Sequence, residues 1–154
     1  MKLSHLDAEG RARMVDVGDK PVSDRTAVAT GAVRMSREAY ELVAGEGVPK
    51  GDVLTVAEVA GVMGAKRTGE LIPLCHPLGL DHVQVEARLD PELPGVQVTA
   101  AARVTGRTGV EMEALTAVTV ACLTVYDMVK AVDKGMVIQD VKLVGKAKRP
   151  AHNP

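Results

Sequence analysis

Residues 109–130 constrain the fold more than any other part of the chain, because they form a long and mostly apolar run. Two carboxylates, Glu111 and Glu113, stand at its start, and an acid–base pair, Asp127 and Lys130, stands one helical turn apart at its end. A helix that is apolar on most sides is a core helix. Charged groups set into it cost on the order of several kcal/mol unless they are paired or used. The run therefore predicts a buried helix with candidate functional groups at both ends.

The composition indicates one domain, residues 1–154, and excludes one class of partner. The chain has 19 Lys and Arg against 20 Asp and Glu, so its net charge is near zero, whereas a general nucleic-acid binder carries a basic surface. Its aromatic residues are two Tyr, which removes the stacking platforms of single-strand binders. We therefore expect no nucleic-acid partner, and we expect any bound heterocycle to be held by hydrogen bonds and aliphatic walls.

Cysteine usage and hydropathy bear on the compartment. Cys75 and Cys122 lack a Cys-x-x-Cys spacing, which argues against a disulfide scaffold and a cysteine-rich zinc site. The first ten residues contain no apolar run long enough for a signal peptide. No segment approaches the roughly 18 uninterrupted apolar residues of a membrane span. We expect a cytoplasmic protein without membrane contact.

Hydrophobic periodicity predicts strands and helices in an order that indicates an α+β fold. Antiparallel strand pairs with helices on one face favour a ferredoxin-like sandwich with a mostly antiparallel sheet. Residues 1–12 and 147–154 are expected to be mobile. The expected elements are a short strand at 14–17, a strand at 25–35, a helix at 36–44, a helix opening at 55, strands at 81–89 and 96–104, a helix at 113–134 and a strand at 136–144.

Local signals predict how the first two helices begin and end. Ser36 can cap the first helix, and Gly45 can supply a left-handed stop. Thr55 and Glu58 have the spacing of a capping box that opens the second helix. That helix carries small residues at intervals of four, which lets another backbone approach one of its faces; they are Ala57, Gly61 and Ala65.

The acid–base pair of the long helix has two interpretations. In one, Asp127 and Lys130 belong to an exposed stripe, and their pairing contributes about a few tenths of a kcal/mol. In the other, Asp127 is a general acid/base, and Lys130 is a cation that binds phosphate or keeps Asp127 ionised. The pattern alone favours the first interpretation.

Two further pairs remain open on the residues alone. Glu111 and Glu113 can stabilise the positive end of the helix dipole, or they can bind a guanine-like edge or a divalent metal. Cys75 and His76 are adjacent, so in an extended segment they point opposite ways and make a poor thiolate–imidazole dyad. A proline-stiffened loop that presents one side chain and backbone groups to a ligand is more plausible, next to the simpler interpretation of a buried Cys beside a surface His.

A phosphate-bearing ligand would have to be held by side-chain cations. The chain contains neither the Walker phosphate loop nor the Gly-x-Gly-x-x-Gly dinucleotide pattern. Lysines on a surface usually serve solvation, so each cation taken alone means little. The cations at element ends and in loops are Lys20, Arg25, Lys50, Lys66 and Arg67.

Several motifs, read together, resemble one family. The two longest are Leu-Ile-Pro-Leu-Cys-His-Pro-Leu at 71–78 and Thr-Gly-Val-Glu-Met-Glu-Ala-Leu-Thr at 108–116. With the shorter matches, the resemblance covers roughly residues 3–146 and is to the cyclic pyranopterin monophosphate synthase (MoaC) family of molybdenum-cofactor biosynthesis. The shorter matches are at 14–17, 50–53, 65–68 and 126–132.

The resemblance implies a reaction, an assembly and a set of site residues. The substrate is (8S)-3′,8-cyclo-7,8-dihydroguanosine 5′-triphosphate, a cyclic dihydro-GTP that is rearranged to cyclic pyranopterin monophosphate with release of pyrophosphate. The family fold is ferredoxin-like, and the family assembles as a hexamer, a trimer of dimers, with sites at subunit interfaces. No cofactor is required, and a divalent metal on the substrate phosphates is left open. The implied catalytic residues are Asp127, Lys50 and Lys130, and the implied substrate-binding residues are Leu74, Cys75, His76, Glu111, Met112, Glu113, Arg25 and Lys66.

The chain departs from the family pattern in two places, and two other functions compete. Thr26 stands where the family often has Arg, and the tail after Lys146 lacks the family's Gly- and Ser-rich repeat. One competing function is a metal-assisted phosphohydrolase that uses the acidic residues and His76. The other is a non-catalytic regulatory domain that binds a small effector, since ferredoxin-like modules host many functions.

Overall fold

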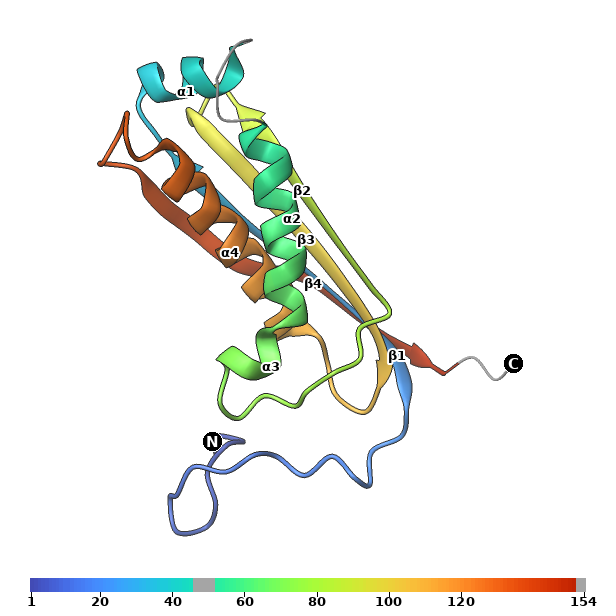
Figure 1. Ribbon diagram of the computed structural model, residues 1–154. Coiled ribbons are helices and arrows are strands. Elements are labelled where there is room, and N and C mark those ends of the chain that lie inside the picture. Colours follow the sequence, from blue (N-terminus) through green and yellow to red (C-terminus); the bar gives the residue numbers. More distant parts are fainter. Residues whose placement is uncertain (46–51, 152–154) are drawn as a thin grey trace.

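The computed structural model describes residues 1–45 and 52–151 of the chain. In this part a four-stranded antiparallel sheet forms one layer, and the two long helices, α2 and α4, lie across one face of it (Figure 1). The elements are β1 (Ser23–Arg34), α1 (Arg37–Ala44), α2 (Val53–Lys66), α3 (Thr68–Leu71), β2 (His82–Asp90), β3 (Gly95–Gly106), α4 (Glu111–Val129) and β4 (Val137–Pro150).

The strand order in the sheet is β2-β3-β1-β4. The central strand β1 pairs antiparallel with both neighbours, so that Ser23 lies opposite Gly106 of β3 and also opposite Pro150 of β4. β2 and β3 form the predicted antiparallel hairpin. This order, with helices in the two crossovers on one face, is the ferredoxin-like arrangement. The predicted fold class is confirmed.

The helix α4 provides much of the core, as its apolar sequence predicts. Its buried side chains, among them Val118 and Val125, belong to one hydrophobic cluster with residues of β1, β3 and α2. By length and composition α4 is also the one helix in the described residues that could cross a membrane. Burial in a core produces the same apolar composition, and the packing of α4 against the sheet accounts for it.

The small residues of α2 let it approach α4 closely, which confirms the prediction from their spacing. A Cβ atom added at Gly61 would lie 3.0 Å from the carbonyl oxygen of Ala117, and one added at Gly64 would lie 2.8 Å from the side chain of Val120. Ala57 is fully buried beside them. Larger residues on this face would push the two helices apart or force strained side chains.

The predicted start of α2 is wrong. The N-cap is Asp52, whose carboxylate accepts a hydrogen bond from the amide of Leu54 at 3.1 Å and another from the hydroxyl of Thr55. Thr55 therefore lies inside the helix. Glu58, expected to close a capping box, instead accepts a hydrogen bond from the amide of Ala87 in β2 at 2.9 Å. The Thr-x-x-Glu pattern was present, but a better cap stood three residues earlier.

Three other helix ends also differ from the expectation. Ser36 does cap α1, since its side chain accepts a hydrogen bond from the amide of Ala39 at 3.1 Å. Gly45, however, has φ −77° and is extended, so it is not a left-handed stop. α4 begins at Glu111 and ends at Val129, earlier at both ends than predicted.

The last strand is longer than predicted. β4 continues to Pro150 and pairs with β1 along its whole length, so residues 147–150 are part of the sheet rather than a mobile tail. The lysines at 146 and 148 look like a solvated tail in the sequence. An edge strand exposes many of its side chains, and the backbone of its partner determines how far it extends. The short strand expected at 14–17 is irregular chain in the structure.

Candidate active site

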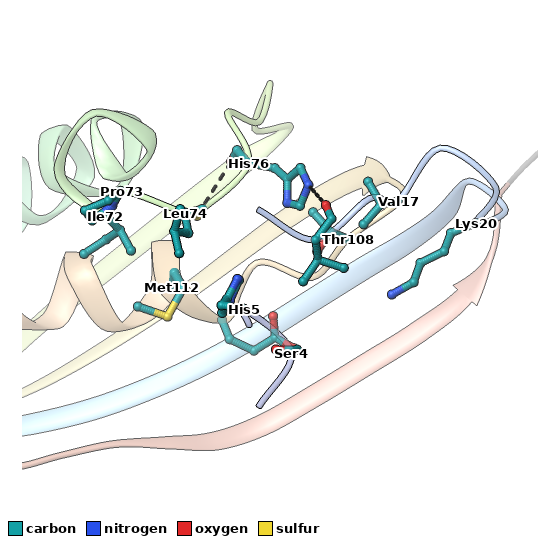
Figure 2. Close-up of a pocket in the computed structure, with 13 residues that line it drawn as sticks. Ser4, His5, Val17, Lys20, Ile72, Pro73, Leu74, His76, Thr108 and Met112 are labelled. Atoms are coloured by element: carbon teal, nitrogen blue, oxygen red, sulfur yellow. Dashed lines mark hydrogen bonds between the residues drawn. The ribbon is translucent and has the colours of Figure 1, made fainter. Parts of the chain in front are cut away.

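A pocket of about 660 Å³ lies at the amino end of α4. Its walls come from three segments that are far apart in the sequence: the N-terminal arm (residues 1–22), the loop between α3 and β2, and the start of α4. Figure 2 shows Leu74 of the loop and Met112 of α4 on one side, with Ser4 and His5 of the arm beside them. The lining residues are Ser4, His5, Val15, Val17, Lys20, Ile72, Pro73, Leu74, Cys75, His76, Thr108, Glu111 and Met112.

The loop after α3 is irregular, as its prolines predict, and it presents His76 to the arm. The Nε2 atom of His76 lies 2.6 Å from the carbonyl oxygen of Val15 (Figure 2). A carbonyl oxygen can only accept, so Nε2 must carry the hydrogen and donate it. The other ring nitrogen, Nδ1, is then left to interact with a ligand, as an acceptor when the ring is neutral.

Glu113 lies beneath this loop and is almost completely enclosed, with 2% of its surface exposed. The thiol of Cys75 donates a hydrogen bond to its Oε1 atom at 3.8 Å, while Oε2 has no hydrogen-bond partner among the described residues. Burial and the nearby charge of Glu111 raise the pKa of Glu113. Burial and Glu113 likewise raise the pKa of Cys75, which makes that thiol a poor nucleophile.

Glu111 is in the opposite electrostatic situation. Partial burial works to raise its pKa, but the hydrogen bond from Lys146, its own backbone amide and the charges of Lys146 and Arg25 outweigh burial and lower the pKa. The amino group of Lys146 lies 2.9 Å from Oε1 of Glu111. A Cβ atom at Gly109 would lie 2.1 Å from Oε2, so the absence of a side chain at Gly109 makes room for this carboxylate.

Arg25 and Lys66 do not line the pocket. The guanidinium of Arg25 donates to the carbonyl oxygens of Gly106 and Arg107, at 3.2 Å each, so its positive charge is held beside Glu111 without being cancelled there. Lys66, at the end of α2, lines a smaller hollow of about 180 Å³ together with Glu113. Glu111 and Glu113 are two positions apart on one helix, so their side chains diverge by about 200° around the helix axis. Glu111 faces the pocket, and Glu113 faces the smaller hollow.

Asp127 and Lys130 lie at the other end of α4. At about 1.5 Å of rise per residue, Asp127 is about 24 Å along the helix from Glu111. The amino group of Lys130 lies 2.6 Å from Oδ1 of Asp127, and both side chains are more than half exposed. The hydrogen bond that Lys130 donates to Asp127, together with the charge of that carboxylate, raises the pKa of Lys130. Within one chain these two residues are therefore remote from the pocket.

The structure thus brings together some of the predicted site residues and leaves others apart. Leu74, Cys75, His76, Glu111 and Met112 line the pocket. Glu113 and Arg25 lie next to it, and Lys66 lines the smaller hollow that Glu113 faces. Asp127 and Lys130 are distant, and Lys50 falls outside the described residues.

Several groups at the pocket are not among the site residues that the sequence predicts. His5 and Lys20 of the arm and Thr108 line it, and Lys146 reaches it by pairing with Glu111. The arm has no hydrophobic periodicity that would bring it to α4. Lys20 stood among the noted cations, but nothing in the sequence separates it from ordinary surface lysines. In the part of the chain that the structure describes, no three His, Cys, Asp or Glu side chains form a group that could hold a metal ion.

The fold and the pocket together define a ferredoxin-like α+β protein with a pocket of small-molecule size at the amino end of its core helix. The sequence model of the MoaC family matches residues 14–148. The chain therefore belongs to the MoaC family, and the resemblance noted from its motifs is confirmed.

Curated relatives carry one name. A protein of Cereibacter sphaeroides (strain KD131 / KCTC 12085) is 61% identical over 144 residues, which cover 94% of this chain and 91% of the relative. A protein of Dinoroseobacter shibae is 58% identical over the same shares. A protein of Chloroflexus aggregans is 58% identical over 145 residues, covering 94% of this chain and 88% of the relative. Each is named cyclic pyranopterin monophosphate synthase.

Proposed function

We propose that the chain is a cyclic pyranopterin monophosphate synthase that works in molybdenum-cofactor biosynthesis. It converts (8S)-3′,8-cyclo-7,8-dihydroguanosine 5′-triphosphate to cyclic pyranopterin monophosphate and releases pyrophosphate. The observation that carries the proposal is that relatives up to 61% identical over 94% of the chain bear this name. The pocket of about 660 Å³ supports it, because it lies within the roughly 300–1,000 Å³ usual for small-molecule sites.

The groups at the pocket suit the two halves of such a substrate. Glu113 and the polar groups of the loop 74–76 can accept hydrogen bonds from the donors of a guanine-like ring. Neither tyrosine of the chain lines the pocket, so hydrogen bonds rather than stacking on a tyrosine would hold the ring. Arg25, Lys66 and Lys146 supply positive charge for phosphate oxygens. Closing a cyclic phosphate with loss of pyrophosphate builds negative charge on oxygen, and cations fixed nearby stabilise that charge in the transition state.

The proposed catalytic residues are Asp127, Lys130 and Lys50, and a second copy of the chain is proposed to bring the first two to the pocket. Opening and reclosing the ring requires proton transfers, which a carboxylate and lysines can perform. Within one chain, Asp127 is about 24 Å along α4 from Glu111. A homo-oligomer, a hexamer built as a trimer of dimers, would place one chain's Asp127 end against another chain's pocket.

Subunit complementation tests the shared site. Asp127→Asn and Glu113→Gln chains, each inactive alone, are unfolded together and reassembled in equal amounts. If the two residues come from different chains, about a quarter of the sites regain both native groups, and that share of the activity returns. If both residues serve a site from one chain, each mixed site still lacks one group and no activity returns. Size-exclusion chromatography with light scattering on the wild-type protein gives the oligomeric state.

The reaction itself is tested by incubating the purified protein with the cyclic dihydro-GTP substrate without added metal. Pyrophosphate and the oxidised fluorescent pterin should form in equal amounts, and both should be lost in the Asp127→Asn and Lys50→Ala proteins. Product that forms only with added Mg²⁺ or Mn²⁺ would favour the metal-assisted phosphohydrolase. Tight binding without turnover would favour the regulatory domain.

We also infer a cytoplasmic location. Both cysteines are free thiols, Cys75 half-buried and Cys122 fully buried. Free thiols are usual where glutathione and thioredoxin keep cysteines reduced. Fractionation of cells that express the protein at its native level would test this, with recovery in a membrane or exported fraction as the opposing result.

A further inference from the structure

The N-terminal arm has an unusual place in the molecule. Residues 1–22 precede β1 and contain neither a helix nor a strand of the sheet, and the first part of the arm is closed on itself by a bridge between Leu6 and Ala12. In Figure 1 the arm runs below α3 and away from the sheet before it enters β1. It nevertheless supplies five of the residues that line the pocket. The arm is therefore a wall of the site rather than part of the core.

One hydrogen bond fastens this wall. In the described part of the chain, the bond from Nε2 of His76 to the carbonyl of Val15 is the one that joins the arm to the rest of the protein. The other hydrogen bonds of the arm are internal, such as those of Asp7 with Arg11 and the turn from Val17 to Lys20. A segment that a single hydrogen bond joins to the rest of the described chain opens at low cost in free energy.

Lys20 is the charged group that the arm brings to the pocket. Figure 2 shows its side chain extending from the arm, with the amino group toward the pocket. It belongs to none of the ion pairs between described residues. Its neighbours in sequence, Asp16 and Asp19, do not line the pocket. Because Glu111 is already paired with Lys146, the charge that Lys20 offers is available to an anionic ligand.

We propose that the arm is a strap of the substrate site, fastened by His76 through the Val15 carbonyl, and that Lys20 on the strap binds a phosphate oxygen of the substrate. The proposal rests on the proposed function, since it takes the ligand to be a nucleoside triphosphate derivative. Binding of phosphate by Lys20 and closure of the strap reinforce each other: the ligand holds the arm down, and the arm completes the ligand's coordination. Lys20 is thus a binding residue, and His76 positions it.

Substitution at Lys20 tests the binding role. Lys20→Gln removes the charge and should raise KM on the order of 10-fold with a much smaller change in kcat, because a charge-assisted hydrogen bond to phosphate is lost in both ground and transition states. Lys20→Arg keeps the charge and should restore most of the loss. Lys2→Gln is the matched control: it removes a lysine of the same arm that does not line this pocket, and it should leave KM unchanged.

Amide hydrogen exchange tests the strap itself, without turnover. Residues 14–20 should exchange rapidly in the free wild-type protein and several-fold more slowly with inorganic pyrophosphate or tripolyphosphate bound. The Lys20→Gln protein should lose this protection even at ligand concentrations that saturate it. The amides of β3 serve as an internal reference, because core strands open only with the whole fold.

The outcomes separate the strap from the proposed function. An active wild-type protein whose KM does not change in Lys20→Gln, and whose arm amides do not respond to pyrophosphate, would overturn the strap and leave the synthase function standing. A wild-type protein without turnover would overturn the function. The exchange experiment with tripolyphosphate would then decide alone whether the arm closes on phosphate.

Discussion

The two ends of α4 carry similar charged groups in opposite settings. At the amino end, Glu113 is 2% exposed, and the side chain of Glu111 is 29% exposed and paired with Lys146. At the carboxyl end, the side chains of Asp127 and Lys130 are 69% and 57% exposed. Within one chain, the carboxyl groups at the amino end of α4 therefore have shifted pKa values, whereas the charged pair at its carboxyl end is exposed to solvent.

The two ends of α4 differ in how far a single chain determines the electrostatic environment of its charged groups. At the amino end, burial raises the pKa of Glu113. Lys146 and Arg25 lower the pKa of Glu111. At the carboxyl end, Asp127 and Lys130 form an ion pair at the surface, where such a pair contributes little to stability. An exposed pair that contributes little to folding can be kept for another reason, which in our proposal is to enter the pocket of a second copy.

The largest expected effect is at the exposed end. Asp127→Asn should lower kcat about 10²–10⁴-fold, the usual contribution of a general acid or base, while the unfolding transition stays where it is in the wild-type protein. Steady-state kinetics and thermal unfolding at a fixed protomer concentration measure the two quantities. A variant that kept full turnover, or that lost activity only because it unfolded, would refute the proposed catalytic role of Asp127.

Much of the fold could be predicted because its signals are local. The alternation along β2 and β3, the apolar run of α4 and the Ser36 cap each depend on neighbouring residues. The wrong predictions concern helix and strand ends that depend on a second residue or strand. Asp52 competes with Thr55 for the cap of α2, and β4 extends beyond residue 144 because β1 offers it a backbone along its full length.

The site was less predictable for the same physical reason. The loop 71–78 and the start of α4 were found through their motifs, but the contacts of Lys146 with Glu111 and of Val15 with His76 join residues 35 and 61 positions apart. Such contacts depend on tertiary packing and leave no periodic pattern. The separation of Asp127 from Glu111, by contrast, follows from helix geometry alone once both are assigned to one helix.

A smaller effect is expected from crowding the enclosed end. Gly109→Ala places a methyl group where Oε2 of Glu111 now lies, 2.1 Å from the added atom. The carboxylate must turn away from Lys146, and weakening a partly exposed ion pair of about 0.2–1 kcal/mol should lower kcat/KM only about 2- to 5-fold. The matched control is Gly79→Ala in the neighbouring loop, where an added Cβ meets nothing within 4 Å. Equal effects of the two variants would refute the packing argument.

The smallest effects should appear in the pH dependence of stability, and they should have opposite signs for the two acids. The pKa of Glu111 is lowered in the folded protein, so this residue stabilises the fold above its ordinary pKa near 4.5, and the contribution is lost as pH falls through the lowered value. Glu111→Gln should therefore be less stable than the wild-type protein at neutral pH, with the difference closing in acid.

Glu113 should behave in the reverse way. Its pKa is raised in the folded protein, so its favourable contribution is complete below about 4.5 and is lost as pH rises through the raised value. Glu113→Gln, which is neutral throughout, should match the wild-type protein in acid and become more stable than it toward neutral pH. Urea unfolding of both variants and the wild type from about pH 3 to about pH 8, at one protomer concentration, measures the two differences. Curves that move in the same direction for both variants would mean that the enclosed end does not hold its two carboxyls in different electrostatic states, since only opposite pKa shifts give opposite signs.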